Sequence, residues 1–447
     1  MAAMASAIVR FEWLGLLLAA PFLLFPDPRR ALALLVVPVL WISRRIARGR
    51  FIDHTPLDVP LALMALMVLV SLYATFDIAY SLPKVAGMVL GIGVFYVIVA
   101  GAVDRKSWIL AGGAFLVGGV AVGSLGLAGT RWIHKFALFE SILARLPARL
   151  TGLPGAAEGF HPNEVAGALL WVAPLACTLA MAAILGARSL KRSLGAVRGA
   201  LLLCALILTA AFLVGVLVLT QSRGGWIAAA LVLPVTLLTL LQGKRRWAAT
   251  AILAATTIAA ALWIGLSHPH ALDPLILGPQ EDPGHGTSLE TLSARFEIWS
   301  RAIYGIQDFA FTGMGMNTFR RVVPVLYPLF TIGPEVDIGH AHNEFLQAAL
   351  DLGIPGLTAF LAVNFGAFAM LAVSWRQRAK LPFPEPLSRA LIIGLGGGLG
   401  AHLIYGLTDA VALGAKPGIL WWMLLGLIAS MYRLQLTANS EQLTANS

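Results

Sequence analysis

A polar stretch in an otherwise apolar chain, GHAHNEFLQAALDLGIPG from Gly339 to Gly356, sets two histidines beside an asparagine and a glutamate. A neutral imidazole, with a pKa of about 6.5, suits a general base that takes a proton from a hydroxyl group. We expect His342, directly before the expected helix start at Asn343, to be that base, with His340 as the second choice. The histidines are two residues apart, so they share a face only if the backbone there is extended.

Two other interpretations of these histidines stay open. A metal ion can be held by both of them together with Asp337 or Glu344, although the acidic residues are not at a recognised ligand spacing. The pair can also simply cap a helix. We expect the first role, with no metal and no other cofactor.

A second polar stretch, GFHPNEVAGALL from Gly159 to Leu170, precedes an apolar segment in much the same way. His161, Asn163 and Glu164 therefore predict a substrate cleft shared with Asn343, and the alternative is ordinary helix capping by Asn163. Asp409 is expected at the outer end of a later span, where it can orient an arginine or the base.

Arginines form a third set. A guanidinium group is always charged and donates paired hydrogen bonds, which suits a phosphate or pyrophosphate at the membrane surface. Arg223 is the most informative, because the turn TQSRGGW holds it at the expected membrane edge. The alternative is that each arginine reaches out to lipid headgroups. The arginines expected on this face are Arg145, Arg149, Arg223, Arg295, Arg301, Arg320 and Arg321.

The elements that position these residues are expected to be membrane-spanning helices. The chain of 447 residues is 58% hydrophobic and 12% charged, with a mean hydropathy of +0.82, which is typical of an integral membrane protein. We therefore predict an all-α polytopic fold of about twelve spans. They lie near residues 11–26, 31–43, 57–75, 84–102, 107–129, 164–185, 199–220, 226–243, 247–266, 354–375, 390–409 and 418–434.

Basic loops predict the orientation, because lysine and arginine concentrate on the cytoplasmic side. Both termini are then cytoplasmic, and residues of about 130–163 and 267–353 lie outside, in the periplasm of a bacterial inner membrane. The large external segment falls between spans nine and ten. Within it LSARFEIWSRAIYGI predicts an amphipathic helix, and NEFLQAALDL a short helix ended by Gly353 and Pro355.

Residues 1–434 are expected to form one transmembrane catalytic domain, and 435–447, which repeat QLTANS, a disordered tail. Two glycine patterns are interpreted structurally. GLGGGLG from Gly394 to Gly400 predicts close helix packing, and GMGMN from Gly313 to Asn317 a tight turn.

The pieces SRGGW, RFEIW and HAHNEFLQAALDLGIPG, in this order and on one expected side of the membrane, resemble the O-antigen ligase and polymerase superfamily. HPNEVAGAL and the twelve-span layout are most similar to its O-antigen ligases. The resemblance covers the chain up to about Leu434. It implies a membrane-embedded, GT-C-like glycosyltransferase that inverts the anomeric centre without a metal.

Such an enzyme moves a glycan from undecaprenyl pyrophosphate to a sugar hydroxyl of lipid A core at the periplasmic face. By matching motif, the resemblance implies that Arg223 and Arg295 bind the donor pyrophosphate and that His342 deprotonates the acceptor. An O-antigen polymerase and a protein O-oligosaccharyltransferase remain alternatives. A lipid or solute transporter is a non-enzymatic alternative, although transporters place ionisable residues nearer the bilayer midplane.

Overall fold

The computed structural model describes residues 2–26, 29–130, 159–267, 292–333 and 336–446, together with 132, 136, 139–146, 150 and 152. These residues form helices joined by turns, and no strand occurs among them beyond one isolated bridge between Thr130 and Phe160. The prediction of an all-α protein is confirmed for this part of the chain.

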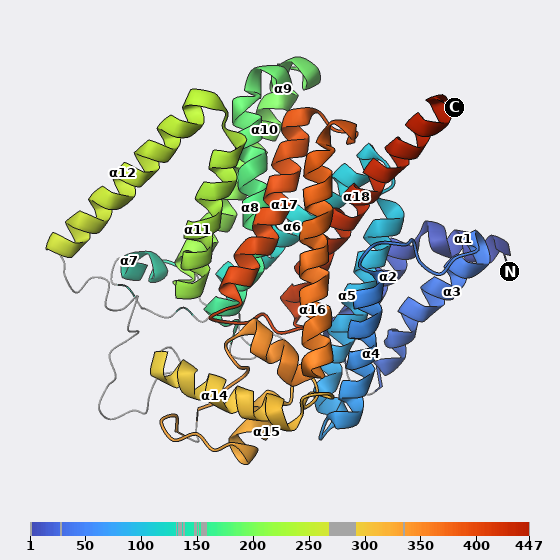
Figure 1. Cartoon of the computed structure of the whole chain (residues 1–447), viewed down its shortest axis with the longest axis vertical. Coiled ribbons are helices and arrows are strands. Elements are labelled where there is room, and N and C mark those ends of the chain that lie inside the picture. Colours follow the sequence, from blue (N-terminus) through green and yellow to red (C-terminus); the bar gives the residue numbers. More distant parts are fainter. Residues whose placement is uncertain are drawn as a thin grey trace.

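The first half of the chain contains helices of very different length (Figure 1). They are α1 (Ala2–Arg10), α2 (Glu12–Leu24), the short η1 (Ala31–Leu35), α3 (Val36–Arg48), α4 (Asp58–Ala74), α5 (Ile78–Gly101), α6 (Arg105–Gly129), α7 (Glu140–Leu143), α8 (Pro162–Leu185), α9 (Ala187–Leu194) and α10 (Ala196–Leu219). The second half contains α11 (Arg223–Leu240), α12 (Gly243–Ser267), α14 (Leu292–Asp308), α15 (Phe319–Leu326), α16 (Glu344–Arg376), η3 (Arg378–Lys380), α17 (Glu385–Tyr405), η4 (Lys416–Gly418) and α18 (Ile419–Asn446).

Eight helices in the described residues are long and apolar enough to cross a membrane. They are α5, α6, α8, α10, α11, α16, α17 and the segment Lys416–Thr437 of η4 and α18. The chain is therefore a polytopic membrane protein. The count becomes nine if α1 and α2, which meet at a 67° bend, form one broken span. The remaining expected spans correspond to α3, α4 and α12, so the number twelve stays a prediction.

Helices α8 and α17 pack against each other at the centre of the bundle. A side chain on Gly398 of α17 would collide with the backbone carbonyl of Trp171 on α8, and one on Gly394 would collide with Thr178. The glycines of GLGGGLG thus let the two backbones approach closely, as the sequence predicts. This contact fixes the end of α17, from which the site described below continues.

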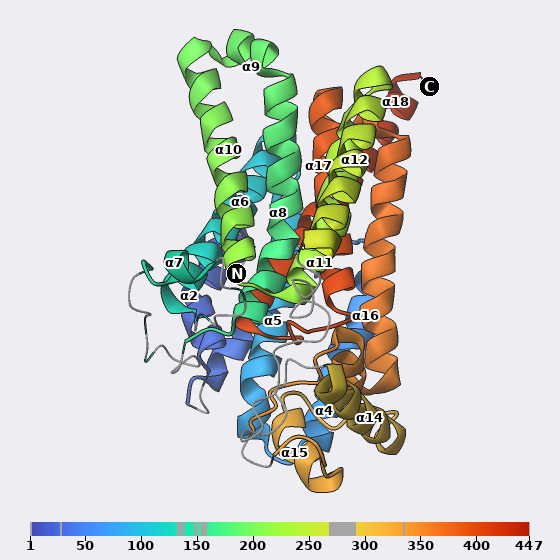
Figure 2. The ribbon, with the colours of Figure 1, turned by 90° about the vertical axis from the view of Figure 1, so that its left-hand side faces the viewer.

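A smaller layer covers one end of the bundle. Figures 1 and 2 show α14 and α15 at this end and the basic helix α9 at the opposite one. On α14 the side chains of Ala294, Ile298 and Ala302 recur every four residues and are buried against residues of the 314–350 segment. The amphipathic helix predicted from LSARFEIWSRAIYGI is confirmed as α14.

Helix α16 is broken where the sequence predicts it. Asn343 caps its first turn, accepting the backbone N–H groups of Phe345 and Leu346 at 3.0 Å each. Gly353 then adopts φ 71°, a left-handed conformation that favours glycine, before the long span resumes. The short helix and the span are therefore two segments that meet at an angle, which frees the first one to lie in the covering layer.

The GMGMN segment is the tight turn predicted from sequence, with φ 69° at Gly313 and 98° at Gly315. It joins α16 to the start of α5. The N–H of Met314 donates to the carbonyl of Leu350 at 2.7 Å, and the Ser81 hydroxyl donates to the carbonyl of Met316 at 2.7 Å. The turn thus joins the short first segment of α16 to the start of α5.

Candidate active site

The carboxylate of Asp409 lies at the centre of a buried polar cluster. Oδ1 is 3.2 Å from Nδ1 of His342, and Oδ2 accepts a hydrogen bond of 2.6 Å from the Asn163 side-chain amide. Nη2 of Arg295 lies 3.5 Å from the same Oδ2. The side chain of Asp409 is only 3% exposed. Residues from four distant parts of the sequence therefore meet at one carboxylate.

Asp409 sits in a turn and not in a span as expected. Helix α17 ends at Tyr405, and Thr408 and Asp409 donate their backbone N–H groups back to the carbonyl of Tyr405. The expected span of residues 390–409 is thus four residues too long at this end. Because Asp409 lies beyond the last turn of α17, its side chain can contact residues of neighbouring segments.

His342 is held by backbone contacts on each side. Its φ of 47° lies in the left-handed region, which a non-glycine residue adopts at a cost of order 1–3 kcal/mol. The preceding N–H, of Ala341, donates to the Gln347 side-chain oxygen at 2.8 Å, and the Trp299 indole donates to the carbonyl of His342 at 3.3 Å. These contacts outweigh the strain and aim the imidazole at Asp409.

Arg295 reaches the cluster from α14. It follows Ala294, on the buried face of the helix, and its Nη1 donates to the backbone carbonyl of Thr408. Its Nε is buried and has no hydrogen-bond partner among the described residues. An N–H in this state retains the capacity to bind an acceptor oxygen that the structure does not contain.

The electrostatics keep Asp409 ionised. Burial alone would raise its pKa, but the charge and hydrogen bond of His342 and the charge of Arg295 together hold the pKa well below its ordinary value. For His340 burial dominates in the opposite sense. Burial and the repulsion of His342 lower the pKa of His340 well below 6.5, against the attraction of Asp409.

The two histidines differ in which ring nitrogen carries the hydrogen. Nδ1 of His340 accepts the backbone N–H of His342 at 3.1 Å, so in the neutral ring Nε2 carries the hydrogen. In His342, Nδ1 faces a carboxylate, which only accepts, so Nδ1 carries the hydrogen and Nε2 has a free lone pair. The side chain of His340 is also more exposed, at 28% against 10% for His342.

The second polar stretch lies at the same place. Asn163 binds Asp409 directly, and the Tyr405 hydroxyl donates to the Asn163 carbonyl at 2.7 Å. His161, not Asn163, caps α8, because its Nδ1 accepts the N–H of Asn163 at 3.3 Å. The charge of His161 also acts on His340. Glu164 is half-buried in the first turn of α8 and acts electrostatically on Lys416.

Arg223 begins α11, next to the loop that carries Asp409. Ser222 caps this helix by accepting the N–H of Gly225 at 3.3 Å. A side chain on the neighbouring Gly224 would come within 2.6 Å of the Thr408 hydroxyl, so this helix start packs directly on the loop. The half-buried Arg223 is thus close in the fold to Thr408, whose carbonyl Arg295 contacts.

The described contacts do not bring the other predicted arginines to this cluster: Arg320 pairs with Asp337 at 2.9 Å, and Arg321 is exposed. Arg301 binds Glu297 at 3.4 Å and the carbonyl of Pro328 at 2.8 Å, which fixes it within the covering layer. Arg145 is exposed beyond α7. Arg149 lies outside the described residues.

One group of acidic and histidine side chains in the described residues has the spacing to hold a metal ion. Its ligand atoms, from His340, His342 and Asp409, lie within 4.8 Å of one another. The acidic partners considered from sequence are elsewhere: Asp337 pairs with Arg320 at 2.9 Å, and Glu344 faces His402. Arg295 and Asn163 already occupy the other oxygen of Asp409, so a cation here would compete with a guanidinium.

Sequence reasoning missed three polar residues around the site. Gln347 holds Ala341 and donates to Asp351 at 2.8 Å, and half-buried Lys84 of α5 acts electrostatically on both His340 and Asp351. The side chain of Lys84 forms no hydrogen bond or ion pair with a described residue. The signal for two of them is present in the sequence, since residues 343, 347 and 351 recur every four and form a polar stripe on one helix face. For Lys84 the sequence offers no such signal.

The chain can now be compared with known protein families. A family model described as O-antigen ligase matches residues 208–361. This match supports membership of the O-antigen ligase/polymerase family. No curated protein matches it. The matched range contains Arg223, Arg295, His340 and His342, whereas Asn163 and Asp409 lie outside it. The family match and the buried cluster therefore share the arginines and the histidines.

The match to the O-antigen ligase/polymerase family suggests a glycosyltransferase-like enzyme of ligase or polymerase type. Its partners in general are a lipid-linked sugar and an acceptor. The resemblance stated from SRGGW, RFEIW and HAHNEFLQAALDLGIPG is thus confirmed at the level of the family.

Proposed function

We propose that the protein is an O-antigen ligase that transfers a glycan from undecaprenyl pyrophosphate to a sugar hydroxyl of lipid A core. The observation that carries the proposal is the contact of both His342 and Arg295 with Asp409. A base and an anion-binding group are thereby held together at one end of a membrane helix bundle. Transfer from a pyrophosphate-linked donor needs these two groups.

His342 acts as the general base. With its Nδ1–H directed to Asp409, Nε2 is free to take the proton of the acceptor hydroxyl. The carboxylate stabilises the imidazolium that forms. His340 keeps a neutral ring beside it, and its Nδ1 is occupied by the N–H of His342, so we assign it an orienting role.

Arg295 and Arg223 bind the donor pyrophosphate. A guanidinium neutralises charge that grows on the leaving oxygen, which is the task that a divalent ion performs in many other transferases. The partnerless Nε of Arg295 supports this assignment. Half-buried Lys84, with no described partner, supplies further positive charge near the site.

The reaction balances without a cofactor. The acceptor oxygen attacks the anomeric carbon, its proton passes to Nε2 of His342, and the bond from the anomeric carbon to the phosphate oxygen breaks. Undecaprenyl pyrophosphate leaves as the anion held by the arginines. Attack opposite to the leaving group inverts the anomeric centre. Orientation of two lipid-anchored substrates then supplies much of the rate.

We place the site at the periplasmic face of a bacterial inner membrane, with both termini in the cytoplasm. In support, the covering layer of α14 and α15 lies at the end opposite the basic helix α9. A lipid-linked donor and a lipid A-core acceptor both present their glycans on that side.

Purified protein with lipid-linked donor tests the proposal. Supplied with lipid A core, it should transfer the glycan to the core and release undecaprenyl pyrophosphate. Extension of a second lipid-linked glycan instead would identify a polymerase, and glycosylation of a protein acceptor an O-oligosaccharyltransferase. Movement of donor across the bilayer without bond formation would identify a transporter. The same assay with EDTA should proceed unchanged, since the arginines carry the charge, whereas strict metal dependence would assign the His340, His342 and Asp409 group to a metal.

A further inference from the structure

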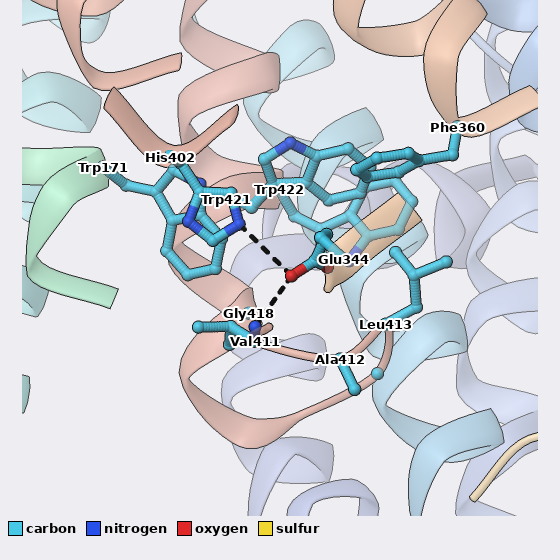
Figure 3. Close-up of a pocket in the computed structure, with 11 residues that line it drawn as sticks. Trp171, Glu344, Phe360, His402, Val411, Ala412, Leu413, Gly418, Trp421 and Trp422 are labelled. Atoms are coloured by element: carbon cyan, nitrogen blue, oxygen red, sulfur yellow. Dashed lines mark hydrogen bonds and ion pairs between the residues drawn. The ribbon is translucent and has the colours of Figure 1, made fainter. Parts of the chain in front are cut away.

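Glu344 is a buried carboxylate that the proposed reaction does not use. It lies two residues after His342 but faces the interior of the helix bundle, and it is only 3% exposed. Figure 3 shows it above Val411 and Ala412 of the loop after α17, with the rings of His402, Phe360, Trp421 and Trp422 around it. The adjoining cavity measures about 10 Å³, which is at the lower limit for one water molecule. This space therefore excludes a substrate, and Glu344 acts through the protein.

Two hydrogen bonds of Glu344 reach the loop that carries Asp409. Its carboxylate Oε2 accepts the N–H of Val411 at 2.7 Å, and its own N–H donates to the carbonyl of Gly406 at 2.8 Å. The neighbouring Asn343 amide donates to the carbonyl of Leu407 at 3.0 Å. The loop is thus held before and after Asp409 by two consecutive residues of α16.

The approach between these segments is close. A side chain on Gly406 would come within 2.9 Å of Cβ of Glu344. Since Gly406 and Val411 lie on either side of Thr408 and Asp409, a shift of the loop moves the carboxylate of Asp409 and the carbonyl that Arg295 contacts. A displacement of about 1 Å in a reacting group can cost on the order of 100-fold in rate.

The imidazole of His402 faces this carboxylate from α17. Its Nδ1 lies 3.2 Å from the carbonyl oxygen of Gly167, which only accepts, so Nδ1 carries a hydrogen. Nε2 lies 3.7 Å from Oε2 of Glu344. Stacking on Trp171, with ring centroids 4.1 Å apart, fixes the imidazole.

We propose that Glu344 is a positioning residue, which holds the 406–411 loop from the membrane side so that Asp409 and the Thr408 carbonyl meet His342 and Arg295. This inference rests on the proposed glycan transfer. Glu344 does not touch substrate, and its carboxylate faces the imidazole of His402.

Two substitutions of the same residue test the role. Glu344→Gln keeps an oxygen for the N–H of Val411, so it should retain kcat within about 3-fold of wild type. Glu344→Leu keeps the volume but leaves that N–H without an acceptor, and it should lower kcat by about 30-fold or more while the KM for donor changes little. The matched control is Asn364→Leu, which removes a buried polar side chain of the same helix that contacts Trp421 and not the loop.

Hydrogen exchange of the 406–415 peptide separates this inference from the proposed function. Glu344→Leu should exchange faster in this peptide than wild type, whereas Glu344→Gln and Asn364→Leu should not, whichever glycan is transferred. Equal kcat in wild type and Glu344→Leu, or equal loss in both Glu344 variants, overturns the positioning role. Unchanged exchange in Glu344→Leu also overturns it. Failure of the wild-type protein to transfer glycan contradicts the proposed function alone.

Discussion

Nδ1 of His342 lies 3.2 Å from Oδ1 of Asp409, although the residues are 67 positions apart in the chain. The contact fixes the tautomer of the histidine, because a carboxylate accepts and does not donate. Asp409 also contacts Arg295 through its other oxygen. The carboxylate of Asp409 thus fixes the tautomer of the base and orients the guanidinium group of Arg295. The two roles can be tested separately.

Asp409→Asn should lower kcat by about 100-fold. The amide keeps the volume of the side chain but loses the charge that stabilises the imidazolium and pairs with Arg295, and it can donate to Nδ1 and favour the wrong tautomer. Steady-state transfer kinetics with both substrates would measure the loss.

The control for this substitution is Asp337→Asn. Asp337 is an exposed carboxylate that pairs with Arg320 at 2.9 Å. Its replacement by asparagine should leave kcat unchanged. If Asp409→Asn stays within 2-fold of wild type, Asp409 does not serve the base.

Arg295→Ala should lower kcat/KM for the donor by about 100-fold, and Arg295→Lys should recover only part of it. Lysine keeps the charge but lacks the planar fork that binds two phosphate oxygens. Arg301→Ala is the matched control, since Arg301 lies six residues further along α14 with partners of its own.

Donor titrations of the three variants would distinguish binding from folding. A loss in Arg301→Ala as large as that in Arg295→Ala would mean that α14 is only being destabilised, and the assignment of Arg295 to the pyrophosphate would lose its support.

The stability of the protein should fall as the pH drops below about 6.5, partly because of His340. Burial lowers the pKa of this imidazole in the folded state, so between that pKa and the ordinary value the unfolded chain binds more protons. Acid therefore favours unfolding in this window, with a limit of about 1.4 kcal/mol per pH unit for one group. Asp409, whose pKa is held low, stays ionised there and adds nothing.

Thermal unfolding in detergent at pH 7 and pH 5 measures this effect. His340→Gln should lose less stability than wild type between the two values. An identical loss in both proteins would show that another group titrates.

Local features of the site could be predicted from sequence, because they depend on neighbouring residues. Asn343 as a helix cap and Gly353 as the break follow from short-range rules. The polar stripe of residues 343, 347 and 351 is equally visible as a four-residue spacing. The span number was harder, since α3 and α4 are shorter than a membrane-crossing helix requires.

Long-range features could not be predicted. Arg295 and Arg301 lie on the same helix and carry the same charge. Only the orientation of α14 relative to the 406–411 loop places Arg295 at the site and Arg301 within the covering layer. Lys84 depends on the approach of α5, more than 250 residues earlier in the chain than His340. The sequence predicts that Asp409 can orient an arginine or the base, but its contact with both depends on tertiary packing that no local pattern encodes.

The role of His342 is tested most directly by the single-turnover transfer of a lipid-linked glycan to lipid A core by purified His342→Ala and His340→Ala. The account predicts that His342→Ala binds donor with unchanged affinity and unfolds at a similar temperature, but forms no product above background. His340→Ala should retain measurable transfer, because its ring only orients. Transfer by His342→Ala at a rate near that of wild type would contradict the assignment of the base.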